Sequence, residues 1–219
     1  MTSKPKRPLK SLYIHIPFCK DKCYYCNFIS LVDKNNFMDQ YIASLLVNIE
    51  QELSKHRVIN LNSIYIGGGT PSLLEIHHFE NILNKISKFF VLDKVSEITV
   101  EINPGTTSFS YLQCLRDLGV NRLSIGIQSF DDKILKLLNR KHNSDQAKQS
   151  ILLAQKAGFE NINLDLMYGL PDQTVEIWVN TLQEALNYDI KHISAYGLKI
   201  ENDNLQIINQ KSKKLKEFI

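Results

Sequence analysis

Three cysteines lie close together in one short segment of the chain. Cys19, Cys23 and Cys26 follow a CxxxCxxC spacing, directly after an apolar run at residues 12–14 that is typical of a β-strand. Three thiolates in one loop can bind three of the four irons of a [4Fe–4S] cluster. The fourth iron then keeps an open coordination position. The spacing therefore predicts a reactive cluster rather than a purely structural one.

Two other interpretations of the cysteine loop remain open. His15 could complete a Cys₃His set for zinc, although structural zinc loops usually carry CxxC pairs. A disulfide would leave one of the three thiols unpaired, and nothing else in the sequence indicates an oxidising compartment. The fourth cysteine, Cys114, lies in a helical pattern beside Leu112, Leu115 and Leu118. We expect it to be a small buried hydrophobic side chain.

A second segment with chemical potential is the run of three glycines, Gly67 to Gly69, followed by Thr70 and Pro71. Glycine lets the backbone approach a ligand closely and accepts a positive φ in a sharp turn. The run is not a Walker phosphate-binding loop, because no Gly-Lys-Ser/Thr follows it. It indicates a bound group at the end of a strand.

Charged side chains occur near the ends of other predicted strands. Glu101 could accept hydrogen bonds from ribose hydroxyls or an ammonium group, or be a solvated charge. Arg140 could bind a carboxylate with its planar fork, or lie on the surface. Asp165 lies in an apolar strand, where an unpaired charge is costly, so we expect a ligand or a cationic partner. Four histidines without metal-ligand spacing are expected to be structural: His77, His78, His142 and His192.

Strand and helix patterns alternate along the chain and must position these residues. We expect strands at residues 11–16, 62–66, 97–102, 122–127, 161–167 and 192–198, and helices at 36–55, 73–89, 108–118, 131–138, 144–157 and 173–188, with a last helix at 205–218. Such β/α units imply parallel strands with right-handed crossovers. Polar residues on inward strand faces favour an open or partial barrel with a ligand in its interior: Glu101, Gln128 and Asp165.

Composition limits the function classes. The chain has 219 residues, 43% hydrophobic residues and a net charge of only +3, which argues against nucleic acid as a partner. No apolar stretch is long enough to span a membrane, and the basic N-terminus has no apolar segment of a secretory signal. We predict a basic tail at 1–10, one α/β core at 11–201 and a polar tail or last helix at 202–219. Reduced cysteines favour the cytoplasm.

Five segments together resemble the radical S-adenosylmethionine (radical SAM) enzymes, and more narrowly the oxygen-independent coproporphyrinogen III oxidase group. They are residues 13–19, the CxxxCxxC loop at 19–26, and residues 67–71, 125–130 and 165–171. The resemblance extends from about residue 9 to residue 201. It implies a partial (β/α)₆ barrel with a [4Fe–4S] cluster at its mouth, held by Cys19, Cys23 and Cys26.

The same resemblance implies contacts with S-adenosylmethionine. Three residues match positions that contact one molecule: Tyr13, Gly68 and Glu101. Seven match contacts to a second molecule in the oxidase: Tyr25, Gly69, Thr70, Gln128, Arg140, Asp165 and Tyr196. At Tyr196 the residue type differs from that of the oxidase.

One departure within the group bears on function. The true oxidase carries a further cysteine just after the cluster loop, whereas residues 27–30 here are Asn-Phe-Ile-Ser. The departure indicates the haem chaperone branch, which implies haem or porphyrin, an unidentified haem acceptor and an electron donor such as a flavodoxin or ferredoxin. The alternatives are a coproporphyrinogen III dehydrogenase or a truncated inactive remnant, because related proteins continue into a C-terminal lid domain that we expect to be missing here.

Overall fold

The computed structural model describes residues 10–55 and 61–199. Six strands form one parallel sheet in the order β1-β4-β5-β6-β7-β8. Their bounds are β1 Ser11–Ile16, β4 Ser63–Gly68, β5 Glu97–Ile102, β6 Arg122–Gln128, β7 Asn161–Tyr168 and β8 His192–Gly197. β1 and β8 stand at opposite ends of this order, so the sheet is a partial (β/α)₆ barrel, as predicted.

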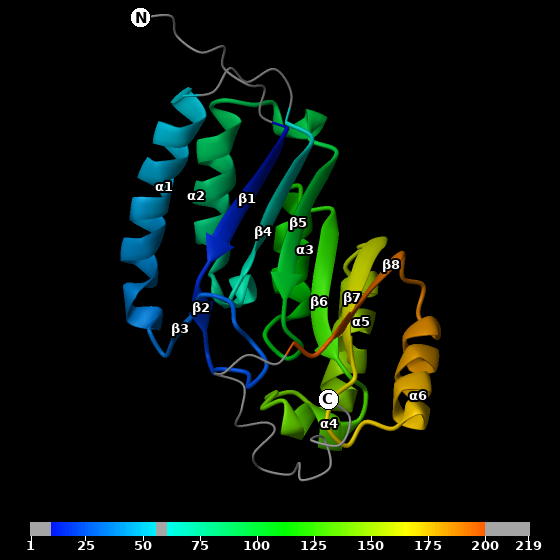
Figure 1. Cartoon of the computed structure of the whole chain (residues 1–219). Helices are drawn as coiled ribbons and strands as arrows, with labels where there is room; N and C mark the ends of the chain where they lie inside the picture. The colour runs from blue at the N-terminus through cyan, green and yellow to red at the C-terminus, as the bar shows by residue number, and fades with distance from the viewer. Residues whose placement is uncertain (1–9, 56–60, 200–219) are drawn as a thin grey trace, which may run out of the picture.

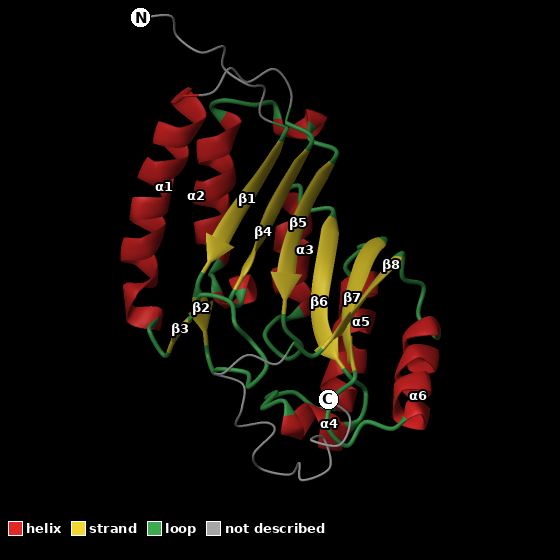
Figure 2. Cartoon of the chain, in the orientation of Figure 1, coloured by secondary structure: helices red, strands yellow, loops and turns green. Residues whose placement is uncertain are grey.

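Helices connect the strands and cover one face of the sheet (Figure 1). Their bounds are α1 Met38–Lys55, α2 Ile76–Ser87, α3 Phe109–Asp117, α4 Asp132–Leu137, α5 Ser144–Lys156 and α6 Val175–Leu186, with 3₁₀ turns η1 Asn35–Phe37, η2 Pro71–Leu73 and η3 Leu92–Lys94. α1 packs on α2, α2 on α3, and α3 on α5. The strands all point the same way, so their carboxyl ends form one rim of the sheet (Figure 2).

Alternation along the strands separates the core from the barrel interior. In β5, Ile98, Val100 and Ile102 are almost completely buried in the core. Glu97 and Glu101 occupy the opposite strand face, because successive side chains in a strand point to opposite sides. The sequence pattern thus leaves charged groups inside the barrel and apolar groups under the helices.

Helix ends follow from local side chains and glycines. The Ser108 hydroxyl caps α3, and Asn143 with Gln146 forms a capping box at the start of α5. Gly119 and Gly158 follow α3 and α5 with φ of +91° and +85°, the left-handed conformation that glycine adopts without strain. Both helices therefore end where the sequence predicts.

The structure corrects one prediction about the core. Cys114 is exposed, not buried. In α3 the buried positions are Leu112 and Leu115, and a residue two positions after Leu112 lies about 200° around a helix with 3.6 residues per turn. The apolar neighbours in the sequence therefore indicated the wrong helix face for this thiol.

Two short strands near the cysteine loop were not predicted from the sequence. A second, two-stranded sheet pairs β2 (Phe18–Cys19) with β3 (Leu31–Val32), and both strands are too short to leave a sequence pattern. The predicted helix at 205–218 and nearly all of the basic tail lie outside the described residues. Within the described part of the chain, no helix combines the length and apolar character that a membrane span requires.

Candidate functional site

The cysteine loop is attached to the fold at its ends and in its middle. β2 contains the first cysteine of the loop and β3 follows the loop, and the pairing of these two strands holds the two ends of the loop together. In the middle, the backbone N–H of Tyr24 donates to the carbonyl of Leu138, and the Asn139 amide donates to the carbonyl of Lys22 (3.2 and 2.8 Å). Leu138 and Asn139 directly follow α4. The loop is therefore held by residues from the β6–α4 unit as well as by its own ends.

One cavity at the carboxyl ends of the strands brings together most of the predicted site. Its volume is about 130 Å³. Its walls contain twelve of the thirteen predicted residues: Cys19, Cys23, Tyr25, Cys26, Gly68, Gly69, Thr70, Glu101, Gln128, Arg140, Asp165 and Tyr196. Segments far apart in the sequence thus converge on the cysteine loop.

Tyr13 is the predicted residue that does not line this cavity. Its side chain is 56% exposed, and its ring stacks beside that of Tyr65 on the neighbouring strand β4 (centroids 6.1 Å apart). Its hydroxyl lies 3.0 Å from Nδ1 of His15. In this structure Tyr13 therefore contacts residues that border the site rather than the cavity itself.

The three thiols of the loop are free and face hydrogen-bond donors. Cys19 is buried, and Cys23 and Cys26 are half-buried. The Thr70 hydroxyl donates to Sγ of Cys19 (3.7 Å), and Nη1 of Arg140 donates to Sγ of Cys23 (3.6 Å). Donors aimed at sulfur suit thiolates, which accept such bonds better than thiols do. Burial raises the pKa of Cys19 and of Cys26, so metal binding must displace their protons.

His15 is not placed as a fourth metal ligand. Its Nε2 lies 2.9 Å from the carbonyl of Ile29 and must donate to it. Its Nδ1 therefore accepts from the Tyr13 hydroxyl. Both ring nitrogens are used, and His15 is not in the cavity wall. A donor set of three thiolates fits a cluster with one open iron better than a closed Cys₃His zinc site.

The glycine run packs the end of β4 against the cysteine loop. The backbone N–H of Gly69 donates to the carbonyl of Ile16, and that of Thr70 to the carbonyl of Phe18, both at 2.8 Å. A Cβ added to Gly69 would meet that Phe18 carbonyl at 2.7 Å and Sγ of Cys19 at 2.9 Å. The missing side chain is thus required by the close approach of two backbone segments.

We expect Gly69→Ala to displace the cysteine loop, because backbone atoms cannot move away as a flexible side chain can. Overpacking of this kind costs about 1–3 kcal/mol. Urea unfolding and iron content per chain measure the two effects. The matched control is Gly197→Ala, whose new methyl would meet only the ring edge of Tyr168, at 3.2 Å. Equal iron content in the two variants would contradict the prediction.

Glu101 is held between β4 and the glycine run. Its Oε1 accepts from the Tyr65 hydroxyl (2.7 Å), and its Oε2 accepts from the backbone N–H of Gly68 (2.9 Å). Burial raises the pKa of the Glu101 carboxyl, and these two bonds partly offset the rise. The carboxylate is oriented toward the cavity with lone pairs left for a hydroxyl or an ammonium group.

The raised pKa of Glu101 makes a prediction about pH. A carboxyl whose pKa is higher in the fold than in the unfolded chain contributes stability below its unfolded pKa and loses it as pH rises through the folded pKa. The Glu101→Gln variant should therefore lose less stability than the original chain as pH rises from about 4, where a model glutamate ionises. Urea midpoints of both proteins over a series of rising pH values measure the difference. Parallel pH profiles would contradict it.

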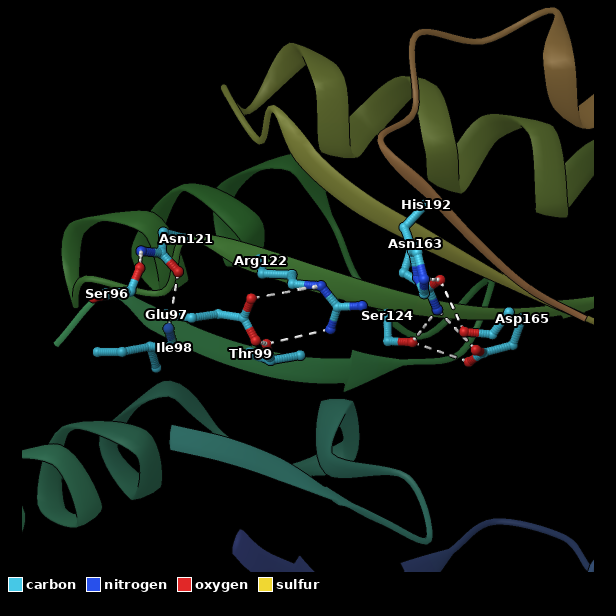
Figure 3. A network of polar contacts seen from close by, with 11 residues as sticks. Ser96, Glu97, Ile98, Thr99, Asn121, Arg122, Ser124, Asn163, Asp165 and His192 are labelled. Atoms are coloured by element: carbon cyan, nitrogen blue, oxygen red, sulfur yellow. Dashed lines mark hydrogen bonds and ion pairs between the residues drawn. The ribbon is translucent and has the colours of Figure 1, made fainter. Parts of the chain in front are cut away.

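A polar network joins strands β6, β7 and β8 and includes two residues of the cavity wall, Ser124 and Asp165 (Figure 3). Asp165 accepts from the Ser124 hydroxyl (3.1 Å) and from the Asn163 amide (2.8 Å). The amide oxygen of Asn163 in turn accepts from the Ser194 hydroxyl (3.0 Å) and from Nδ1 of His192. Burial raises the pKa of Asp165, and the Ser124 and Asn163 bonds counter it. The charge predicted to need a partner is thus held mainly by neutral donors.

Gln128 and Tyr196 also line the cavity. Gln128 has a φ of +70°, which is unusual for a residue other than glycine, at a shift of register between β6 and β7. Its amide oxygen accepts from the Tyr196 hydroxyl (2.6 Å). Strained backbone of this kind is concentrated at functional sites. Here it places a buried amide beside the cavity.

Asp39, His77 and His78 form a group outside the site whose ligand atoms lie within 4.8 Å of one another. However, Nδ1 of His78 accepts from the backbone N–H of Glu75 (3.2 Å), so its Nε2 carries a proton and donates to Asp39 (2.8 Å). A metal on Nε2 would require a proton on Nδ1, facing that N–H. The geometry favours the structural role predicted for these histidines, in which His78 joins α2 to α1.

Comparison with known proteins shows which family the chain belongs to. The sequence model of the radical SAM superfamily matches residues 13–204 of this chain. The chain belongs to the radical SAM superfamily. The predicted membership and the predicted parallel α/β fold are both confirmed.

Similar proteins of this radical SAM family are longer than the chain. One named Heme chaperone HemW, from Buchnera aphidicola, is 45% identical over 195 residues, which cover 89% of this chain and 52% of the relative. One of the same name from Escherichia coli is 40% identical, over 91% of this chain and 53% of the relative. The solved structure of coproporphyrinogen III oxidase HemN from Escherichia coli, described as a radical SAM enzyme, is 29% identical with a TM-score of 0.84, over 96% of this chain and 48% of that one. The chain spans about half the length of these relatives.

Proposed function

We propose that Cys19, Cys23 and Cys26 bind a [4Fe–4S] cluster and that the adjoining cavity binds S-adenosylmethionine. Membership of the radical SAM superfamily supports both cofactors. The observation that carries the proposal is the convergence of three free thiols and the glycine run on one cavity. A bound cluster would supply an open iron for the amino and carboxylate groups of S-adenosylmethionine and the electron that breaks its carbon–sulfur bond.

The chain's own residues would orient this nucleotide and shield it. The Glu101 carboxylate is fixed by the Gly68 amide and faces the cavity, where it could accept hydrogen bonds from ribose hydroxyls or the methionine amino group. Gly69 allows the backbone to come within contact distance of Cys19, so the bound group can lie against the sulfurs. Gln128, Asp165 and Tyr196 would line the place of the second molecule that the oxidase binds.

We further propose that the protein serves as a haem chaperone, which binds haem and transfers it to an acceptor protein. The names of the curated relatives and the lack of a cysteine at residues 27–30 support this function. A second cavity of about 450 Å³ adjoins the first, and apolar side chains in its wall suit a flat macrocycle: Tyr25, Phe28, Met167 and Leu198. The protein would bind haem in a reducing cytoplasm, and a flavodoxin or ferredoxin would be the electron donor to the cluster.

A second candidate function is coproporphyrinogen III dehydrogenase, favoured by the likeness to HemN. Anaerobic incubation of the reconstituted chain with coproporphyrinogen III separates the two candidates, because only the dehydrogenase would form protoporphyrinogen. Haem titration followed at the Soret band tests the chaperone, and a lack of saturable binding would contradict it. A broad, non-cooperative thermal transition would instead indicate an inactive remnant.

A further inference from the structure

We infer that Arg140 tunes the proposed cluster: its guanidinium donates a hydrogen bond to the Cys23 thiolate and raises the reduction potential of the cluster. This inference rests on the proposed cluster site. It differs from the contact with S-adenosylmethionine that the resemblance assigns to Arg140, since it requires no nucleotide. Arg140 acts here through another residue and is a positioning residue.

The orientation of Arg140 is fixed by the sheet and not by the cysteine loop. Its Nη2 donates to the side-chain oxygen of Asn103, which follows β5, and to the backbone carbonyl of Gly126 in β6 (2.7 and 2.6 Å). These two short bonds leave Nη1 directed at Sγ of Cys23 (3.6 Å), with the Tyr25 hydroxyl at 3.5 Å. The donor is therefore in place whether or not the loop carries a cluster.

The environment of the guanidinium strengthens its effect on the sulfur. Nε of Arg140 is buried and has no hydrogen-bond partner among the described residues. A charge removed from water is screened less, so its field on a neighbouring thiolate is larger than at the surface.

Chemistry gives the direction of the effect. Reduction adds an electron to a cluster already surrounded by thiolates, and hydrogen bonds to the sulfurs together with nearby positive charge stabilise the reduced form. Cys19 receives neutral hydroxyl donors, from Thr70 and Ser30, whereas Cys23 receives a donor with a full positive charge. Arg140 should thus contribute more than Thr70 to the ease of reduction.

The test is a redox titration of the reconstituted full chain without S-adenosylmethionine, followed by electron paramagnetic resonance. At a fixed solution potential, Arg140→Met should lower the ratio of reduced to oxidised cluster about tenfold, a midpoint lower by about 59 mV for one electron. Arg140→Lys keeps the charge but loses the planar fork, and should fall between the two. If the Met variant loses iron, the Lys variant decides.

The matched control is Lys141→Met, which removes the same charge from the next residue. Lys141 pairs with Asp21 at 3.4 Å on the exposed side of the loop. Its variant should keep the potential of the original chain. Equal reduction potentials in the original chain and both Arg140 variants would overturn the inference. So would equal shifts of the reduction potential in Arg140→Met and Lys141→Met. A chain that binds no iron before any substitution would instead contradict the proposed cluster site.

Discussion

Replacing Cys23 by alanine is expected to lower the iron content of the reconstituted chain by at least about tenfold. Loss of an outer-shell partner already lowers metal affinity about 10–100-fold, and loss of a metal ligand should cost more. The thiol is only half-buried, so its removal leaves no large core cavity. The free energy of unfolding of the metal-free chain should therefore change by less than about 0.5 kcal/mol. Iron analysis and the visible spectrum after anaerobic reconstitution measure the loss.

Cys114→Ala is the matched control for this experiment. It removes the one cysteine that lies outside the loop, which is exposed on α3. The variant should keep its iron and its spectrum. If Cys23→Ala kept a full cluster, or if Cys114→Ala lost one, the assignment of the three loop cysteines as ligands would be wrong.

Phe18→Ala is expected to have the largest effect on stability, about 3–5 kcal/mol, the usual cost of deleting a buried aromatic ring. Phe18 is completely buried next to the first cluster cysteine, and its ring packs edge-on against Tyr41 of α1 (centroids 5.4 Å apart). Loss of the ring should also free the start of the cysteine loop, so cluster loading should fall. Urea unfolding and iron content measure both effects.

Phe28→Ala removes the same side chain from the other end of the loop. That ring is 67% exposed, so its loss should change the free energy of unfolding by less than about 0.5 kcal/mol. Similar unfolding midpoints for the Phe18 and Phe28 variants would show that the loop is not anchored through the core.

The strands and helices could be predicted from sequence because each has a strong local signal. The bounds predicted for β1 and β5 agree with the structure, and those of the other strands differ by one or two residues. The spacing of the loop cysteines indicates a candidate metal site, and their role as ligands stays a prediction. The exposure of Cys114 could not be predicted, because a helix with leucines on both sides of a cysteine does not reveal which face is buried.

The partners of the site residues could not be predicted in this way. Arg140 contacts Cys23, Asn103 and Gly126, which come from three different parts of the chain. The positive φ of Gln128 has no signal in its residue type. Such contacts depend on the register of neighbouring strands, which a single sequence does not encode at short range.

The anchoring of the cysteine loop has a consequence for the order of maturation. Tyr24 reaches Leu138, beyond the fourth strand of the main sheet, and Gly69 reaches Ile16. The three sulfurs therefore converge only after β1, β4 and the β6–α4 unit have assembled, which requires contacts between distant segments. If the proposed cluster binds here, iron and sulfide would be delivered to a chain that has already folded, and the bound cluster would stabilise the folded barrel rather than start its folding.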